Sequence, residues 1–443
     1  ALSGAGTINF NGGNHTFAGQ FLPTGRVNFN AGTITIANPI TPAVIGPLSS
    51  VTLVFNAPQS FPSLTLSGGT MTGPGDVTIT GTLTWSSGFL ASGGKLIIAN
   101  GATADLTTGG EKDLNRTLDN AGTVNYTGIG LYFGFPVAGT GVINNLANGV
   151  FNVSGEGDFR PLISTTSAFN NAGTFNKRGA GTTTAFDVPF TNTGIVDVLS
   201  GTLALRAGGS HSGSFVLGVN AYLALVGTHT LASGGRISGA GELSVSGTFL
   251  HQGADLSARL GVNGGRVTLE GPTPLRALTV TAPGVLDANV PLQLDALEQI
   301  SLHAGGQVTV GSQWLGSTRC LNQSLLNGAV TFDGAGTAGA PQLLEVMSQD
   351  LGTNWAGFVR NFAFGTLTLA NNTYVRLLDQ SDNAPGAEAE ALYVNTLNVP
   401  AGTTLDLNGL KLYVRTLQLA GTLVGGSATP VRDGGTIQWG NAT

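Results

Sequence analysis

The residues best suited to bind a metal ion lie in one acidic stretch near the C-terminal end of the sequence, residues 379–390. Four carboxylates and one asparagine fall within these twelve residues, and strand-like sequence flanks them on both sides. Carboxylate and carbonyl oxygens in a loop are the ligands that Ca²⁺ prefers. The spacing matches no EF-hand or nonapeptide calcium repeat, so the alternative is a solvated loop that keeps a strand edge from aggregating. The predicted calcium ligands are Asp379, Asp382, Asn383, Glu388 and Glu390.

Residue patterns that support catalysis are missing from the sequence. Polysaccharide hydrolysis needs paired carboxylates, and there is no Asp-Asp pair and no Gly-His-Gly. The five histidines lie far apart, so zinc has little support and each is expected to be solvated or capped. Lys95 follows two glycines, as in a phosphate loop, but Leu96 stands where Ser or Thr is needed. We expect no enzyme and no cofactor other than calcium.

Threonine alternates with apolar residues in residues 78–84. A flat rank of threonines on a β-helix would suit ice or carbohydrate, provided that it recurs from one coil to the next. Other threonine pairs, such as Thr33 with Thr35 and Thr70 with Thr72, share no obvious register in the sequence. The favoured interpretation is therefore the ordinary preference of β-branched residues for strands.

The composition restricts the class of protein. Only 9% of the 443 residues are charged, against about a quarter in an average domain. A hydrophobic content of 41% excludes a disordered chain, yet no apolar stretch reaches the roughly 18 residues that span a bilayer. A net charge of −6 with four lysines leaves no basic patch for phosphates. We therefore expect neither a nucleic-acid partner nor a membrane span.

The cellular compartment is inferred from the first residue, because a single cysteine does not decide it. The sequence begins with Ala1 rather than Met, which fits a mature protein after removal of a signal peptide. The single cysteine, Cys320, cannot form an intramolecular disulfide and is expected to be a small buried residue. We expect an extracellular or cell-surface location.

Irregular repeats decide the predicted architecture. Gly122, Gly149, Gly173 and Gly194 each end a similar corner motif and are separated by 27, 24 and 21 residues. Short runs between the corners alternate apolar and polar residues, as in Thr202-Leu203-Ala204-Leu205, which is the period of half-buried strands. Periods of this size with glycine corners are typical of solenoids. The predicted fold is all-β, a right-handed parallel β-helix of about 20 coils.

The predicted domain organisation has four parts. Residues 1–340 are assigned to solenoid repeats, and 341–362 to an insertion that contains a short helix or a wide bulge. Residues 363–426 form a C-terminal solenoid module, and 427–443 form a terminal strand behind a glycine-rich linker.

Some of these repeats also resemble a known group of proteins. The residues that carry the likeness are 169–175, 190–198 and 200–203 in the repeats, and 344–352, 372–377, 390–394 and 404–409 near the C-terminus. They are similar to large secreted bacterial surface proteins with parallel β-helix repeats, of the filamentous-haemagglutinin-like and autotransporter-adhesin-like kind. The resemblance implies secretion and a role in surface structure or adhesion, including biofilm formation, and it implies no catalytic residues.

Three functions follow as hypotheses. The first is a structural subunit of an extracellular bacterial filament that assembles head-to-tail from copies of itself, because the ends of a solenoid expose unpaired strands. The second is an adhesin rod that binds carbohydrate or a surface, with extracellular polysaccharide as a further partner. The third is a polysaccharide-degrading β-helix enzyme. The residues predicted to form the assembly contacts are Thr7, Ile8 and Phe10 at one end and Val431, Ile437 and Trp439 at the other.

Overall fold

The chain forms a parallel β-solenoid of about 20 coils with 58% strand and 1% helix, which confirms the predicted fold class. The computed structural model describes residues 2–40, 44–135, 139–163, 166–271, 273–295, 299–317, 319, 325–359, 361–385 and 389–431. The chain divides into two compact units, Ala1–Gly227 and Thr228–Thr443. Within the described residues, no helix is long and apolar enough to cross a membrane.

The first unit begins with short strands, which are followed by two long ones. Its early strands are β1 (Leu2–Gly4), β2 (Ile8–Phe10), β3 (Asn14–Phe17), β4 (Phe21–Pro23), β5 (Arg26–Phe29), β6 (Gly32–Ile36), β7 (Val44–Ile45) and β8 (Val51–Phe55). Two longer strands, β9 (Gln59–Gly73) and β10 (Val77–Gly93), then pair in parallel along much of their length. Register shifts within this pair mark places where the strands pass solenoid corners.

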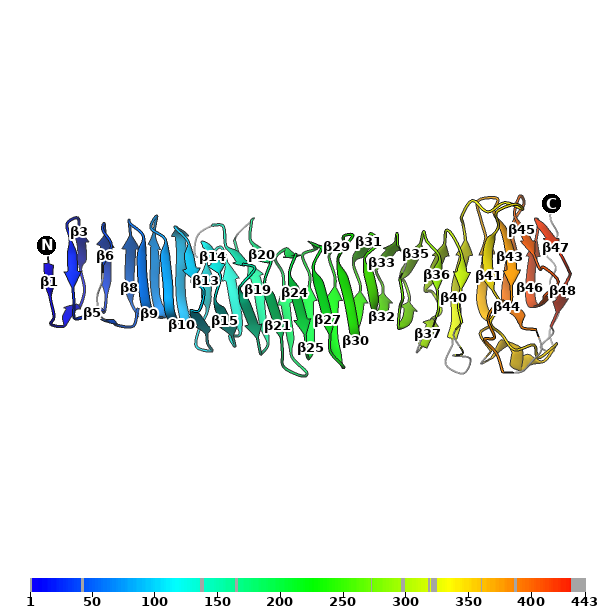
Figure 1. Cartoon of the computed structure of the whole chain (residues 1–443), viewed down its shortest axis with the longest axis horizontal. Coiled ribbons are helices and arrows are strands. Elements are labelled where there is room, and N and C mark those ends of the chain that lie inside the picture. The colour runs from blue at the N-terminus through cyan, green and yellow to red at the C-terminus, as the bar shows by residue number, and fades with distance from the viewer. Residues whose placement is uncertain are drawn as a thin grey trace. The chain divides into compact units, whose positions relative to one another are not determined.

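From residue 96 onward strands of successive coils stack beside one another (Figure 1), and strand pairing assigns one strand of each coil of the first unit to each of three sheets. The first sheet contains β11 (Leu96–Ile98), β14 (Thr117–Asn120), β17 (Val142–Asn145), β20 (Ala168–Asn171), β23 (Phe190–Asn192) and β26 (Gly209–His211). The second sheet contains β12 (Thr103–Leu106), β15 (Thr123–Tyr126), β18 (Val150–Val153), β21 (Thr174–Lys177), β24 (Ile195–Val198) and β27 (Ser214–Leu217). The third sheet contains β13 (Lys112–Leu114), β16 (Gly130–Phe133), β19 (Gly157–Pro161), β22 (Thr183–Phe186), β25 (Gly201–Leu205) and β28 (Ala221–Leu225).

Inward-facing side chains form a continuous apolar core in the first unit. Along strands such as β15 and β18, buried residues alternate with half-buried ones, as the sequence period predicts. Aromatic rings stack between successive coils, with centroids 4.1 Å apart for Phe159 and Phe186 and 5.1 Å apart for Phe169 and Phe190. Each coil therefore buries its apolar face against its neighbours, which is how a solenoid is stabilised.

A buried asparagine ladder runs along one corner of this core. The ladder residues end successive strands of the first sheet and lie in register: Asn120, Asn145, Asn171 and Asn192. Each amide nitrogen donates to the next amide oxygen, at distances of 2.8, 2.7 and 2.8 Å. The Asn120 and Asn192 oxygens also accept the backbone N–H of the glycine two residues later, which closes the corner.

The second unit also has three sheets of parallel strands. One contains β29 (Thr228–Leu231), β31 (Thr248–His251), β33 (Arg266–Leu269), β35 (Val285–Ala288) and β38 (Gln307–Val310), and another β30 (Arg236–Val245), β32 (Asp255–Asn263), β34 (Ala277–Thr281) and β37 (Gln299–Leu302). The third contains β36 (Leu292–Gln293), β39 (Trp314–Leu315), β41 (Gln342–Glu345), β43 (Tyr374–Leu378), β45 (Thr404–Asp406) and β47 (Thr422–Val424). The last coils use longer strands, namely β40 (Leu325–Phe332), β42 (Phe364–Leu369), β44 (Ala391–Val399) and β46 (Lys411–Leu419), with the short β48 (Ala428–Pro430).

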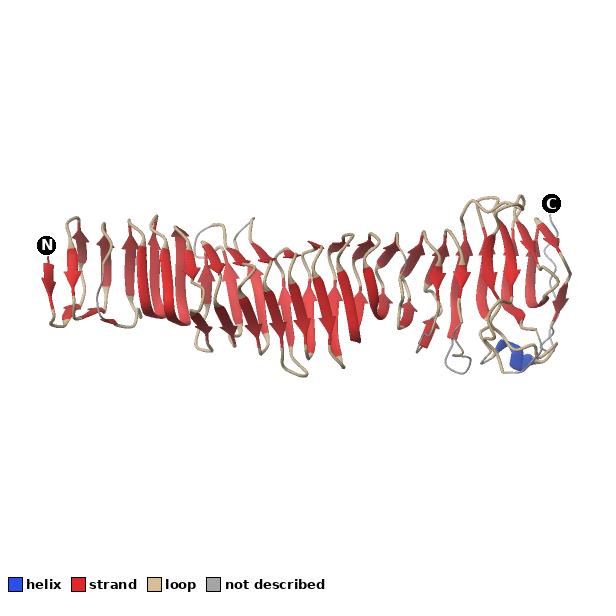
Figure 2. Ribbon diagram, viewed as in Figure 1, coloured by secondary structure: helices blue, strands red, loops and turns tan. Residues whose placement is uncertain are grey.

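The insertion predicted at 341–362 starts later in the structure. Residues 342–345 form β41, which pairs with β43 as a regular solenoid strand. The helix of the insertion is a single 3₁₀ turn, η2 (Trp355–Phe358), drawn in blue in Figure 2. The side chain of Asn354 caps the start of this turn, and the glycine within WAGF disfavours a longer helix.

Candidate functional site

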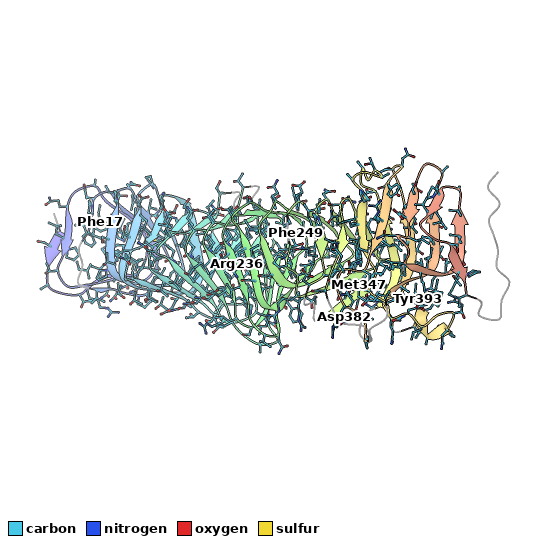
Figure 3. The ribbon with its side chains drawn as sticks, turned by 45° about the vertical axis from the view of Figure 1, so that its right-hand side comes forward. Phe17, Arg236, Phe249, Met347, Asp382 and Tyr393 are labelled. Carbon is cyan, nitrogen blue, oxygen red and sulfur yellow. The ribbon has the colours of Figure 1, made fainter. Side chains whose placement is uncertain are left out.

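The predicted calcium ligands lie in the loop between β43 and β44 of the second unit. Asp379 and Asp382 are exposed, whereas Asn383 and Glu390 are buried. Figure 3 labels Asp382, which forms an ion pair with Arg319. Glu388 lies outside the described residues.

The backbone of this loop donates hydrogen bonds to Glu345 of β41 and to carboxylates of the loop itself. Glu345 Oε1 accepts from the amides of Gln380 and Ser381, at 2.7 and 2.8 Å. Glu390 Oε1 accepts from the amide of Ala384. Asp379 Oδ2 in turn accepts from the amide of Glu390, at 3.0 Å. Through these hydrogen bonds the acids fix the position of the loop relative to β41 and β44.

The predicted ligands that the structure describes each have other partners. Asn383 donates its side-chain N–H to the carbonyl of Gly316 at 3.1 Å, away from the acids. Among the described residues, no group of three or more His, Cys, Asp or Glu side chains is placed to hold a metal ion. Calcium at this loop stays a prediction. Calorimetry tests it: heat on calcium addition and a melting temperature lowered by EDTA would support the site, and a null result in both would exclude it.

Glu390 is the most perturbed acid of the loop. Its pKa is raised to about 7, mainly by burial. Hydrogen bonds from the amides of Ala384 and Asn383 lower this pKa, and the charges of Asp379 and Glu345 raise it. Burial also raises the pKa of Glu345. The sequence analysis does not identify Glu345, although its position between Leu343-Leu344 and Val346-Met347, at the end of β41, is the signal that reveals it.

A second group of buried charges lies in the first unit, at β13 and the corner that follows it. Lys112, Asp113 and Arg116 are all at most 2% exposed. Arg116 donates to two carbonyls of earlier coils, Ala91 at 2.8 Å and Met71 at 3.3 Å. This side chain therefore ties three successive coils together.

Asp113 differs from its charged neighbours in its strand partners, which are aromatic. It pairs in register with Phe89 on one side and Tyr132 on the other. Burial, with a smaller contribution from Glu111, raises the pKa of Asp113 to about 7. Asp113 therefore binds a proton more readily than an exposed aspartate does.

The histidines are more buried than the sequence predicts. His211, His229 and His251 are at most 1% exposed, so of the two expected alternatives, a solvated or a capped ring, the solvated one does not apply to these three. They occupy inward positions of strands, where an imidazole fills core volume. His251 is capped as expected, by the carbonyl of Ala254 at 2.7 Å, and burial lowers its pKa.

The predicted assembly residues of the first coil lie on or beside β2. Thr7 is exposed and Ile8 is half-buried. Phe10 packs with Phe29 in a stacked arrangement at 5.4 Å, and it joins Phe17 and Phe21 in an aromatic cluster. In the described part of the chain, β1, β2 and β3 each pair on one side only, with β4, β5 and β6.

Val431 already makes backbone and side-chain contacts within its own chain. Its backbone N–H donates to the carbonyl of Val414 at 2.9 Å, directly after β48 pairs with β46. Its side chain joins an outer cluster with Phe358, Tyr393 and Tyr413. The solenoid therefore continues through the predicted linker to residue 431, and a role of Val431 in assembly would require its release from this cluster. Ile437, Trp439 and Cys320 lie outside the described residues.

The outer cluster attaches the insertion to the solenoid. Tyr393, labelled in Figure 3, stacks on Tyr413 at 4.7 Å and meets Phe358 of η2 edge-on at 5.2 Å. Its hydroxyl accepts from the amide of Leu351 and donates to the carbonyl of Gly352, both at 2.8 Å. This buried tyrosine thus joins the insertion to the last coils.

The fold defines the class of this chain as a parallel β-solenoid. No protein-family model, curated protein or solved structure matches it significantly.

Proposed function

We propose that this chain is a non-enzymatic structural subunit of an extracellular bacterial filament, which grows head-to-tail by adding solenoid coils from copies of itself. The observation that carries the proposal is the uniform mode of stacking. In each unit, successive coils join by in-register parallel strand pairing, as between β15 and β18 or between β33 and β35. A coil from another copy can add by the same interaction, because backbone pairing needs no particular side chain.

Interactions between coils support a load-bearing role. The buried asparagine ladder joins four successive coils, and Arg116 joins three. Hydrogen-bond networks of this kind in a low-dielectric core resist separation of the coils. Secretion and surface location are part of the proposal and rest on the resemblance to secreted surface proteins.

The strands proposed for assembly are β1 to β3 on one coil and β47 and β48 on another. Within the described residues, β47 pairs only with β45 and β48 only with β46. Pairing between two different edges is heterologous, and a heterologous contact that does not close produces a filament.

Sedimentation velocity and electron microscopy of two deletion variants test this proposal. Deletion of residues 432–443 removes the predicted assembly residues Ile437 and Trp439 and leaves β48 and Val431 in place. Deletion of residues 427–443 removes β48 and Val431 as well, so the comparison separates the contribution of β48 from that of the following residues. We expect filaments from the full chain and shorter or fewer filaments from the larger deletion. A full chain that stays monomeric at high concentration would contradict the proposal and favour the adhesin hypothesis.

A further inference from the structure

The outer face of the second sheet in the first unit carries two regular columns of polar side chains. The threonine column contains Ser63, Thr82, Thr103, Thr123, Val150 and Thr174, which are paired in register from coil to coil. The amide column lies two residues further along the same strands and contains Thr65, Thr84, Asp105, Asn125, Asn152, Asn176 and Asp197. All of these side chains are half-buried or exposed.

The threonine column corrects the interpretation of the sequence. Thr82, Thr103 and Thr123 lie directly beside one another on three successive coils. The sequence conceals this register because the number of residues per coil varies with the length of the corners. The condition for a threonine rank that contacts a ligand, recurrence from coil to coil, is therefore met.

The amide column is held in a fixed orientation by its own hydrogen bonds. Each amide nitrogen donates to the preceding residue of the column: Asn125 to Asp105, Asn152 to Asn125, and Asn176 to Asn152, all at 2.9 Å. A carboxamide has two N–H donors and two acceptor lone pairs. The ladder uses one donor and one lone pair of Asn125 and of Asn152, so each keeps one donor and one acceptor for a ligand.

The spacing of the array is set by sheet geometry. Neighbouring strands are about 4.8 Å apart, and the two columns are separated by about 6.8 Å along each strand. The seven residues of the amide column therefore extend over about 29 Å. Its only carboxylates are Asp105 and Asp197, so the three coils between them are uncharged on this column.

We propose that this face binds an extended, neutral polysaccharide whose chain runs along the coils between the two columns. Each sugar hydroxyl is both donor and acceptor, which matches the remaining capacity of the amides and the threonine hydroxyls. An uncharged polymer avoids the cost of removing charges from water. Many weak contacts repeated on one polymer add up to useful avidity. The face is separate from the strand edges proposed for assembly, so binding does not depend on filament formation.

Affinity gel electrophoresis tests the proposal, with hydroxyethylcellulose, xyloglucan and galactomannan as separate probes. The binding variant is Thr82→Val, Thr103→Val and Thr123→Val together, which removes three hydroxyls and keeps β-branched side chains. The control is Thr33→Val, Thr52→Val and Thr70→Val, because these residues form another threonine column on the third-sheet side, through β6, β8 and β9. Thermal melting verifies that both variants fold.

We expect at least one probe to retard the full chain, and the binding variant to raise the dissociation constant about tenfold or more. The control should bind as the full chain does, and Val150→Thr, which completes the column, should tighten binding. The proposal is overturned if none of the three probes retards the full chain, or if both triple variants weaken binding equally. If no probe retards the full chain but the full chain changes the shape of ice crystals, the ligand of this face would be ice and not polysaccharide. Filament formation is scored on the same samples, so its loss and the loss of binding are distinguishable.

Discussion

Replacement of Asn171 by alanine tests whether the buried asparagine ladder holds the coils together. The side chain of Asn171 accepts from Asn145 at 2.7 Å and donates to Asn192 at 2.8 Å and to the carbonyl of Ile195 at 3.0 Å. Asn171 is 1% exposed, so water cannot replace these partners in the folded chain. At about 1 kcal/mol net for each bond, the substitution should cost about 3 kcal/mol.

The neighbouring residue provides a matched control. Asn170 is exposed and donates a single side-chain hydrogen bond to Asn144, at 2.9 Å, so Asn170→Ala should cost less than about 1 kcal/mol. Hydrogen exchange followed by mass spectrometry measures both variants. We expect Asn171→Ala to speed exchange about a hundredfold in β17, β20 and β23 and much less in distant coils, because each coil contacts only its neighbours. Equal effects of the two variants, or a uniform change along the first unit, would refute this reasoning.

Three further predictions concern stability. Leu203→Asp places an unpaired charge in the core and should cost several kcal/mol, with hydrogen-exchange protection lost mainly in adjacent coils; uniform loss along the unit would contradict it. The raised pKa values of Asp113 and Glu390 mean that the folded chain binds these protons more tightly than the unfolded chain, so stability should fall by a few kcal/mol as pH rises from about 4 to above 7. Urea unfolding at pH 5 and pH 8 measures this, and Asp113→Asn and Glu390→Gln should flatten the dependence; an unchanged slope would disprove the assignment. Tyr393→Phe removes the hydroxyl that joins Leu351 and Gly352, so limited proteolysis should cut the insertion faster while the solenoid melts almost unchanged; equal cleavage rates would count against its anchoring role.

The repeats in the sequence are sufficient to predict the fold class. Glycine corners such as Gly122 and Gly149, with alternating strands between them, leave few alternatives to a solenoid. The buried ladder was not predicted, although Asn120 and Asn145 stand two or more residues before those glycines. An asparagine at a corner satisfies the local backbone by itself, so the local pattern provides no reason to expect a second hydrogen bond to the next coil.

The two surface columns and the buried charges could not be predicted from local sequence patterns, because they depend on coil register and on tertiary packing. Thr103 and Thr123 align because the intervening corners have particular lengths, and one extra residue in a corner would remove the match. Lys112 and Asp113 belong to a polar run that resembles an exposed loop. Their burial arises from tertiary packing around β13, which no local pattern encodes.

Cryo-electron microscopy of the purified full chain tests the central claim most directly. If coils of different copies pair as coils within one chain do, filaments should show parallel strands that continue across each subunit junction with a spacing of about 4.8 Å. Particles that remain single chains at high concentration, or filaments whose junctions lack strand pairing, would contradict head-to-tail assembly.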